Sequence, residues 1–471
     1  MLSTKKLSSS FALSLAFSLF AVSCGQKNDS SLKSEISGST DLLPSSLGKG
    51  FDSLTQTLKG KCVTGTPVWA GSPESEFSYV HDLDFDTLLV NYNGGINVET
   101  KISLFDIKGA GEFASKNAAD DFSSTLSLIH NISLKKKVLD ELRVDESMRN
   151  AIFKNGTVSP QIRALCGDEY VSSIAYGASL IVNAKFTFQT REDKKDFSTN
   201  VNLGAFDLGS LGGKIGTLNN SLKNNSRVTI SARQVGGDPE KLANILASEV
   251  ISCNLASFEE KCLPMLSRLI EYAKDSENGF RSGLSVSPES DAKETPKGWA
   301  QLRFITSAFA DEPLEGEFLV SSTDSPVLSD RIRDARDEVY DLNRDSLRDF
   351  ERAALLLKNY NLSEEQTSAL QSLQSAIQGN KIDLATLTKT CLKKPDQCVS
   401  ELNRYKNRSA KYDADILLIK PESLAAEPVV EETAEEPKRG GFWGSWFKPL
   451  SNVASSCRYE SDWNEDSYVC S

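Results

Sequence analysis

The chain has 471 residues, a formal net charge of -12 at neutral pH and an isoelectric point near 5.0. This length is enough for about two or three domains with a sizeable core. The acidic balance leaves no basic stripe that could neutralise phosphates, so nucleic acid is excluded as an expected partner.

The N-terminus has the order of an export signal. Lys5 and Lys6 precede an apolar run, Phe11 to Val22, and small residues follow that run. The run is too short to span a bilayer, which is typical of a cleaved signal. We therefore expect a signal peptide at residues 1–23.

The residues at the end of this signal are Ala-Val-Ser-Cys, positions 21–24. They resemble the lipobox of bacterial lipoproteins, in which the cysteine is acylated, with palmitate among other chains, and becomes the mature N-terminus. This resemblance implies a lipid anchor at Cys24 and a place in the cell envelope, at the outer membrane. The alternative is a plain secretory signal with an incidental cysteine. Residues 24–50 are rich in Ser, Lys, Asp and Gly, which predicts a flexible tether.

Export would place the cysteines in an oxidising compartment. The chain has nine cysteines, so eight remain when Cys24 is set aside. Eight cysteines allow roughly a hundred pairings, and proximity in the sequence serves as the guide. Metal ligation fits poorly because no CxxC occurs and the chain has only 2 histidines, so we expect no metal. The expected disulfides are Cys62–Cys166, Cys253–Cys262, Cys391–Cys398 and Cys457–Cys470.

Three segments alternate apolar and polar residues with the period of a half-buried strand. They are residues 122–134, 166–190 and 227–237. Between the first two segments, residues 135–165 have a mostly helical pattern. Residues 87–105 are expected to be extended.

Two residues stand out within these strands. Gly177 interrupts the longest strand, where it has no side chain to pack against its neighbours. A glycine at such a place allows a sheet to bend sharply or another backbone to approach closely. His130 lies on the apolar side of its strand, which predicts a hydrogen-bonded core residue.

The insertion at residues 191–226 can be interpreted in three ways. As a helix, it has one apolar face, formed by Val201, Ala205, Leu208, Leu211, Ile215, Leu218 and Leu222. As a strand, its first half alternates, with Phe197, Val201, Leu203 and Ala205 on one side, and each arm of a hairpin would be near the roughly 9 to 11 residues of a membrane-spanning strand. As a Gly/Asn/Ser-rich segment, it fits a solvated loop.

The C-terminal part differs in character. Residues 326–412 have the apolar spacing of an all-α module. We expect its second helix to begin at a capping box, Ser363 with Gln366, and to stop at Gly379-Asn380.

Residues 413–438 are predicted to form an acidic linker, and residues 439–471 a disulfide-bonded aromatic tail. The aromatic residues of Gly440–Phe447 suit a membrane interface. Alternatively, they pack back onto the domain, because buried aromatic rings contribute much area to packing.

The order of motifs from Cys166 to Val250 resembles the core of the membrane-attack-complex/perforin and cholesterol-dependent-cytolysin superfamily. Gly167-Asp168-Glu169-Tyr170 is followed after six residues by Gly177-Ala178, and the returning strand ends in Gly236-Gly237 before a helix. Cys166, Glu169 and Ala178 depart from the pattern, standing in place of an aromatic residue, a histidine and a second glycine.

The resemblance implies an α+β domain at residues 51–310, followed here by the all-α module. Its core would be a bent, twisted, antiparallel four-stranded sheet flanked by helical clusters. Gly177, Gly236 and Gly237 would permit the bend. In the superfamily, the helical clusters unfurl into membrane-spanning hairpins.

We therefore expect a perforin-like lipoprotein that binds a lipid membrane and forms a homo-oligomeric β-barrel pore. The candidate hairpin comprises Val201, Leu203, Ala205, Leu208, Leu211, Ile215 and Leu218. A first insertion, Ile107–Asp121, is the weaker candidate, because it is too short for two spanning arms without its flanking strands.

The alternative is a non-lytic surface or envelope lipoprotein that uses the same fold for adhesion or for binding a protein partner. A permanent lipid anchor favours this alternative, because a toxin must reach another membrane. No nucleophile elbow, HExxH motif or similar catalytic constellation appears, so we expect neither an enzyme nor a cofactor.

Overall fold

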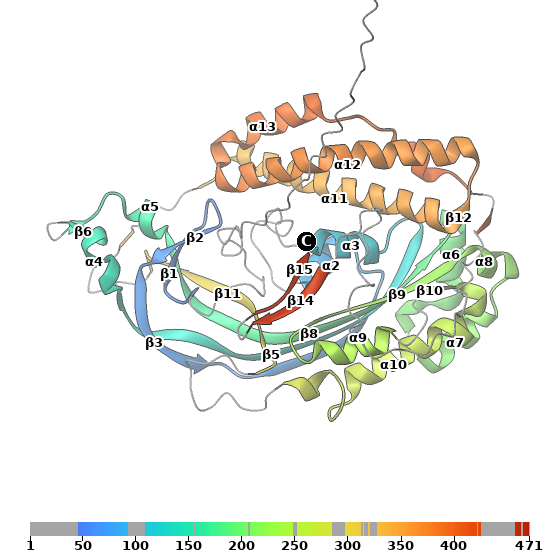
Figure 1. Cartoon of the computed structure of the whole chain (residues 1–471), viewed down its shortest axis with the longest axis horizontal. Coiled ribbons are helices and arrows are strands. Elements are labelled where there is room, and N and C mark those ends of the chain that lie inside the picture. Colours follow the sequence, from blue (N-terminus) through green and yellow to red (C-terminus); the bar gives the residue numbers. More distant parts are fainter. Residues whose placement is uncertain are drawn as a thin grey trace, which may run out of the picture. The chain divides into compact units, whose positions relative to one another are not determined.

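The structure of the chain is a computed structural model (Figure 1). It describes residues 46–470 except 93–108, 155–156, 206–207, 248–251, 285–296, 312–313, 315–318, 321–326, 422, 425–456 and 463–464. The described residues fall into two compact units, residues 46–424 and residues 457–470. The predicted sheet domain and the predicted helical module therefore belong to one unit.

An antiparallel sheet with two long central strands forms the core of the larger unit. The central strands are β5 (Ser123–Val144) and β8 (Glu169–Thr187), which pair with each other. Two shorter strands lie end to end on the free side of each, β3 (Val63–Ala70) and β4 (Glu74–His81) beside β5, and β9 (Arg227–Val235) and β11 (Ala300–Ala308) beside β8. The predicted antiparallel sheet, four strands wide, is confirmed.

Three short strands extend this sheet. β1 (Lys49–Asp52) pairs with β2 (Thr57–Lys61) and with the start of β8, and β10 (Ser252–Asn254) pairs with β9. The backbone N–H of Gly48 donates to the carbonyl of Val171 at 2.9 Å. The predicted tether is therefore wrong at its C-terminal end, because backbone pairing brings residues 46–50 into the fold.

Strand pairing is interrupted along one line that crosses the sheet. Ser133 of β5 pairs with Gly177 of β8, but the next pair is Lys136 with Ala175, so β5 carries one extra residue there. An extra residue of this kind is a β-bulge, which bends a strand. Along the edge of β5 that faces away from β8, β3 ends and β4 begins at this same line. Along the edge of β8 that faces away from β5, the pairing partner changes there from β9 to β11. The sheet is strongly curved in Figure 1.

The helical pattern over residues 135–165 is wrong for its first part, because β5 continues to Val144. Residues 136–144 pair with β3, and this cross-strand pairing outweighs local helical preference. The short elements that follow are α4 (Glu146–Ile152), β6 (Phe153–Lys154), β7 (Thr157–Val158) and α5 (Ile162–Cys166).

Two helical clusters interrupt the sheet. The first, between β4 and β5, comprises α2 (Phe85–Tyr92) and α3 (Ala110–Asn117). The second, between β8 and β9, comprises α6 (Arg191–Val201), η3 (Leu203–Ala205), α7 (Leu208–Gly216) and α8 (Asn220–Asn225).

The expected extended segment is wrong over residues 87–92. Leu88, Leu89 and Tyr92 are buried at helical spacing, so the packed face decides the local structure. Residues 93–105 lie outside the described residues.

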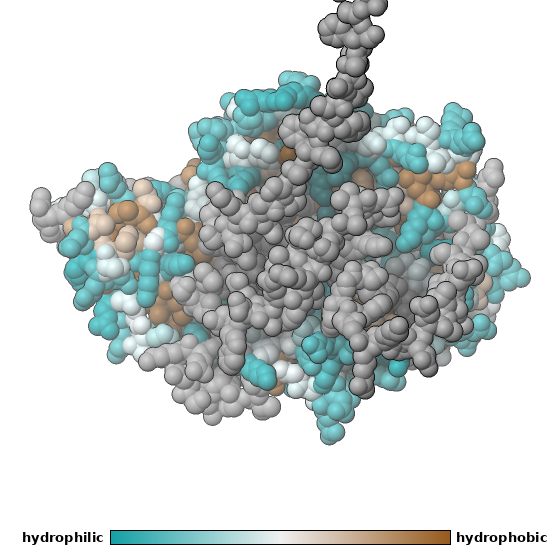
Figure 2. All heavy atoms as spheres, viewed as in Figure 1, coloured by the Kyte–Doolittle hydropathy of each residue, from teal (hydrophilic) through white to brown (hydrophobic). Residues whose placement is uncertain are grey.

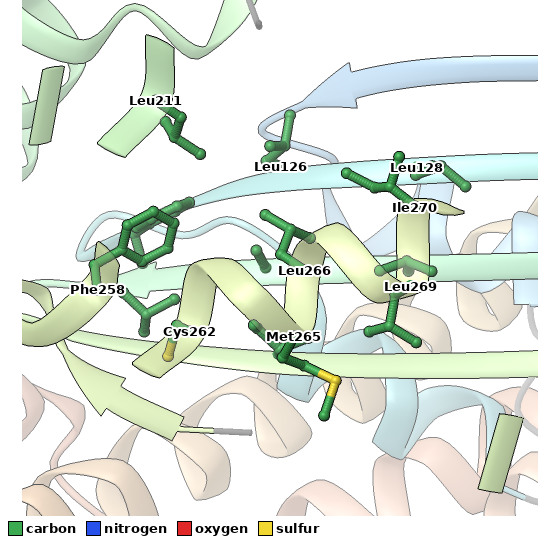
Figure 3. Packing of buried hydrophobic residues seen from close by; sticks show 14 of the residues in the cluster. Leu126, Leu128, Leu211, Phe258, Cys262, Met265, Leu266, Leu269 and Ile270 are labelled. Atoms are coloured by element: carbon green, nitrogen blue, oxygen red, sulfur yellow. The ribbon is translucent and has the colours of Figure 1, made fainter. Parts of the chain in front are cut away.

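Apart from β10, the described elements between β9 and β11 are helical. They are α9 (Pro239–Ala247), η4 (Leu255–Ser257), η5 (Phe258–Cys262), α10 (Leu263–Lys274) and η6 (Phe280–Gly283). α10 packs its apolar side against the central strands, and Figure 3 shows Leu266, Leu269 and Ile270 beside Leu126 and Leu128.

The all-α module comprises α11 (Asp330–Asn359), α12 (Glu364–Lys393) and α13 (Pro395–Arg408). The capping box of Ser363 with Gln366 is confirmed. The expected stop at Gly379-Asn380 is wrong, because α12 continues through both residues. The side chain of Asn380 instead donates to the carbonyl of Ala410 at 2.9 Å and accepts from its N–H at 2.8 Å.

The module extends beyond its predicted end. A short helix, η8 (Ala414–Leu418), packs on it through buried Leu417, and β12 (Tyr360–Asn361) pairs with β13 (Ser423–Leu424). The start of the predicted acidic linker therefore belongs to the module.

Three of the predicted disulfides are present, Cys62–Cys166, Cys253–Cys262 and Cys391–Cys398. In the smaller unit, β14 (Cys457–Asp462) and β15 (Glu465–Cys470) form a hairpin with Cys457 opposite Cys470. The side chains of these two cysteines lie outside the described residues, so their disulfide stays a prediction. Cys24 and residues 440–447 also lie outside the described part.

The space around Gly177 yields a prediction. A Cβ at Gly177 would lie 2.4 Å from Leu302 Cδ1 and 2.6 Å from Ile132 O. Gly177→Ala should therefore lower the free energy of unfolding by about 1–3 kcal/mol, the usual range for overpacking. Urea unfolding followed by circular dichroism measures this change.

Gly213→Ala is the matched control. Gly213 lies in α7 with nothing within 4 Å of an added Cβ. Alanine there should raise stability by roughly 0.5–1 kcal/mol, because it has the better helix propensity. A Gly177→Ala protein as stable as the unmodified chain would contradict the role assigned to the missing side chain.

Candidate functional site

The second helical cluster lies on one face of the sheet, which we call the outer face. This face carries the even-numbered residues of β5 and β8 near the cluster, such as Leu128, Val182 and Phe186. The ring centroid of Phe197, in α6, lies 5.0 Å from that of Phe186 and 4.9 Å from that of Phe188. The cluster thus shares one apolar core with the sheet and with α10.

The helical interpretation of residues 191–226 is confirmed, and a solvated loop is wrong. Thr190 caps α6, and its hydroxyl accepts from the N–H of Asp193 at 3.1 Å, completing a capping box. Leu208 is partly buried against the same core, and the side chain of Ala205 lies outside the described residues. The other predicted positions are buried, Val201, Leu203, Leu211, Ile215 and Leu218.

The opposite face of the sheet, which we call the inner face, is polar and buried. Its odd-numbered residues form a network in which Ser127 Oγ donates to Asn183 Oδ1 at 2.6 Å. Asn183 Nδ2 donates to Asn117 Oδ1, in α3, at 3.1 Å. Lys185 pairs with Asp120 at 3.4 Å. The first cluster therefore lies on the inner face, held by polar contacts and by the apolar packing of α2 and α3.

The motif Gly167-Asp168-Glu169-Tyr170 lies at the start of β8. Gly167 has φ +76°, and a Cβ there would lie 2.0 Å from Phe51 O. Asp168 is buried and accepts from Ser53 N–H at 2.9 Å and from Ser53 Oγ at 2.6 Å. The ring of buried Tyr170 packs 5.3 Å from that of Phe309. Next to the Cys62–Cys166 disulfide, the motif thus joins β1, β8 and the end of β11.

The structure brings the predicted bend glycines together. Gly236 and Gly237 have φ values of +72° and +73° and form the turn after β9. A Cβ at Gly236 would lie 3.1 Å from Gly177 O, so the two glycines adjoin. Gly298 also belongs to this turn, since its carbonyl accepts from Gly237 N–H at 2.6 Å and its φ is +82°. A lone glycine in Lys-Gly-Trp gave no signal for this role.

The described residues hold no obvious chemical centre. Within them, no three His, Cys, Asp or Glu side chains are grouped so as to hold a metal ion. Nor does this part of the chain contain a helix that is long and apolar enough to cross a membrane.

The chain was compared with known proteins at the level of sequence and of structure. No protein-family model and no curated protein matches it. Among solved structures, stonustoxin is similar, with 9% identity and a TM-score of 0.36 over 80% of this chain and 44% of that one. A putative cell invasion protein with a MAC/perforin domain from Bacteroides thetaiotaomicron has 10% identity and a TM-score of 0.25 over 64% and 60%.

A further similar structure is GNIP1Aa from Chromobacterium piscinae, with 14% identity, a TM-score of 0.23 and coverage of 48% of this chain and 49% of that one. The matched part of this chain therefore spans less than two thirds of each of these three proteins. The antiparallel sheet, its line of interrupted pairing and the two helical clusters agree with the architecture that the sequence resemblance implied.

His130 gives a prediction for pH dependence. It is buried, its Nδ1 lies 3.0 Å from Ala273 O and its Nε2 lies 3.2 Å from Ser75 Oγ, so the expected core role is confirmed. Burial lowers the pKa of His130 in the folded state. The unfolded state then binds the proton more tightly, so stability is lost as pH falls through the ordinary histidine pKa of about 6.5.

His130→Gln should therefore lose less stability between pH 7 and pH 5 than the unmodified chain does. Urea unfolding at both pH values measures the difference. His81→Gln, at the only other histidine and on an exposed site, is the control. Equal pH dependence in His130→Gln and the unmodified chain would contradict this account.

Proposed function

We propose that this protein binds lipid membranes and that its two helical clusters convert into β-hairpins of a homo-oligomeric pore. The proposal is supported chiefly by one observation. When the existing strand registers are continued over residues 88–119 and over residues 197–205 and 209–217, every charged residue of these stretches falls on one face. The separation follows from the pairing of β4 with β5 and of β8 with β9.

The β8–β9 register extends naturally into the second cluster. Ser179 pairs with Val235 and Thr187 with Arg227. If this ladder continued without a slip, Phe197 would face Thr217 and Ala205 would face Gly209. The chain would then turn at residues 206–208.

Such a hairpin would have one uncharged face. Its arms, residues 197–205 and 209–217, are each close to the roughly 9–11 residues that a tilted membrane strand needs. The odd-numbered positions are Phe, Thr, Val, Leu and Ala in the first arm, and Gly, Leu, Gly, Ile and Thr in the second. The even-numbered positions carry the polar side chains, Ser198, Asn200, Asn202, Ser210 and Lys214.

The β4–β5 register has a similar property in the first cluster. His81 pairs with Leu126, and continuing that ladder would place Leu88 opposite Ala119 and Tyr92 opposite Ser115. Between Leu88 and Ala119 this face carries no charge, whereas Glu112 and Lys116 fall on the other. Nearer the sheet, Asp86 would lie opposite Asp121 on the first face, so the uncharged stretch begins at Leu88 and ends at Ala119. In the printed sequence, Glu99 and Lys101 are odd-numbered and belong to the first arm, whereas Asp106 and Lys108 are even-numbered and belong to the returning arm. Because this register pairs odd with even numbers, all four fall on the same face as Glu112 and Lys116. The first insertion, once α2 is included, is therefore longer than its sequence boundaries suggested.

Both uncharged faces lie on the same side of the sheet. Odd-numbered residues of β5 pair with odd-numbered residues of β8, as in Ser127 with Asn183, and the uncharged positions of both hairpins continue this inner face. Four strands would thus present one uncharged and mainly apolar surface to lipid, and one surface with the charged residues to a lumen.

Oligomerisation follows from the physics of a bilayer. An open sheet in lipid would leave backbone groups unpaired at both edges, each costing several kcal/mol, so membrane strands close into barrels. Two hairpins from one chain supply too few strands for a closed barrel, since about eight is the lower limit for known ones. We therefore propose assembly from several copies, with the lipid anchor at Cys24 retaining the protein at the outer membrane.

A cysteine staple tests this function. Ser124 Oγ of β5 lies 3.4 Å from Ser198 Oγ of α6. The Ser124→Cys/Ser198→Cys pair, in a fragment without the first 24 residues, should form a disulfide that holds the second cluster on the sheet. We expect dye release from liposomes by the unmodified fragment and almost none by the oxidised pair, with each single variant as control.

Equal leakage from the oxidised pair would contradict the conversion of the second cluster. Tight binding by the unmodified fragment, without leakage or rings, would instead favour a non-lytic surface or envelope lipoprotein that binds a partner.

A further inference from the structure

We infer that the all-α module is a built-in restraint, which holds both clusters on the sheet until the module moves away. This inference rests on the proposed function, because it concerns what must happen before the clusters convert. It is carried by the contacts of the module with every junction between a cluster and the sheet. In Figure 1, α11–α13 lie across the concave side of the curved sheet.

The module reaches the two junctions of the first cluster through α11. Where β4 passes into α2, the hydroxyl of Tyr340 donates to Asp86 Oδ1 at 2.5 Å. Where α3 passes into β5, the guanidinium of Arg352 stacks 3.9 Å from the ring centroid of Phe122. Burial, together with nearby Asp86, raises the pKa of Tyr340, so its hydroxyl stays protonated as a donor.

The segment after α11 and the end of the module reach the two junctions of the second cluster. Where β8 passes into α6, Gln189 Nε2 donates to the carbonyl of Pro421. Where α8 passes into β9, the hydroxyl of Tyr360 donates to the carbonyl of Asn225 at 3.4 Å. All four points at which the chain must straighten during conversion are therefore in contact with the module.

The module also makes an apolar contact with the first cluster. Tyr340 is 4% exposed and packs in one core with Leu88, Leu89 and Ala114 of the first cluster. The ion pair of Lys381 with Glu112, at 2.9 Å, adds little by itself, because both side chains are 53% exposed. The module thus seals the first cluster between itself and the inner face.

The same packing places the module where lipid would have to be. The uncharged positions of both proposed hairpins continue the inner face, and α11 covers that face. At its other end, α11 is tied to the turn between β1 and β2, since Arg336 Nη2 donates to Leu54 O at 2.8 Å. In Figure 2 the upper part of the molecule, where the module lies, is mostly hydrophilic, with hydrophobic residues toward its right-hand end.

A cross-link between the module and the first cluster tests this inference. Glu112→Cys with Lys381→Cys, joined by a short bis-maleimide, would tie α12 to α3 at an exposed pair. The matched control is Glu338→Cys with Lys406→Cys, at an ion pair between α11 and α13 that ties the module only to itself. Both proteins are compared on liposomes by dye release and by hydrogen exchange of the described amides of α2 and α3.

We expect the module-to-cluster cross-link to slow dye release by about tenfold or more, since each 1.36 kcal/mol of barrier changes a rate tenfold. It should also keep the α2 and α3 amides protected on vesicles. The control cross-link should change neither. Leakage and exchange equal to those of the control would overturn the restraint while leaving pore formation standing.

If no protein leaks at all, the proposed function fails and the exchange measurement alone decides the restraint. Protection of α2 and α3 that is higher with the module-to-cluster cross-link than with the control then supports the restraint. Equal protection overturns it.

Discussion

At the centre of the sheet, Gly177 lies against the backbone of Ile132 on one strand and the side chain of Leu302 on another, closer than a Cβ would permit. This close approach occurs on the line where pairing changes partners, and the bulge in β5 adds its extra residue at the same line. The bend that results gives the sheet a concave side. The first cluster and the module occupy that side, while the second cluster and α10 cover the other face.

The sequence of the second cluster fits both a helical and a strand conformation. In the described conformation, Val201, Leu211 and Ile215 point into a shared core at helical spacing. In the proposed hairpin, the same residues fall on one face of two paired strands. Burying each such side chain contributes roughly 1.5–3 kcal/mol, and a bilayer interior offers comparable burial. Conversion would therefore move these side chains from one apolar environment to another. The barrier to conversion would come from the contacts with the module and with the core, which must break first.

Much of the fold could be predicted from the sequence, because strict alternation marks the half-buried strands and Gly177 stands out within one of them. Two disulfides of the larger unit, Cys253–Cys262 and Cys391–Cys398, followed from cysteine spacing, and Cys62–Cys166 followed as the remaining pair. The sequence did not reveal β3 and β4, whose residues are largely exposed or half-buried and lack a clear period. It also misplaced the end of β5, where pairing across the sheet outweighs a local helical pattern.

The candidate site was only partly predictable for a related reason. A face of α7 or α8 can be found by spacing alone, but the partner of that face cannot. The contacts of Tyr340 with Asp86 and of Arg352 with Phe122 join residues far apart in the sequence, and single tyrosines or arginines in a charged helix carry no signal for such roles. Gly298 is similar, because its positive φ matters only beside the Gly236-Gly237 turn.

The central claim is that the second cluster becomes a hairpin in the register of β8 and β9. Oxidative cross-linking of cysteine pairs on liposomes tests it most directly. We predict efficient disulfide formation for Phe197→Cys with Thr217→Cys, which would lie opposite each other, and little for Phe197→Cys with Gly216→Cys, whose side chains would point to opposite faces. Equal yields from the two pairs, or no membrane-dependent yield from either, would contradict the account.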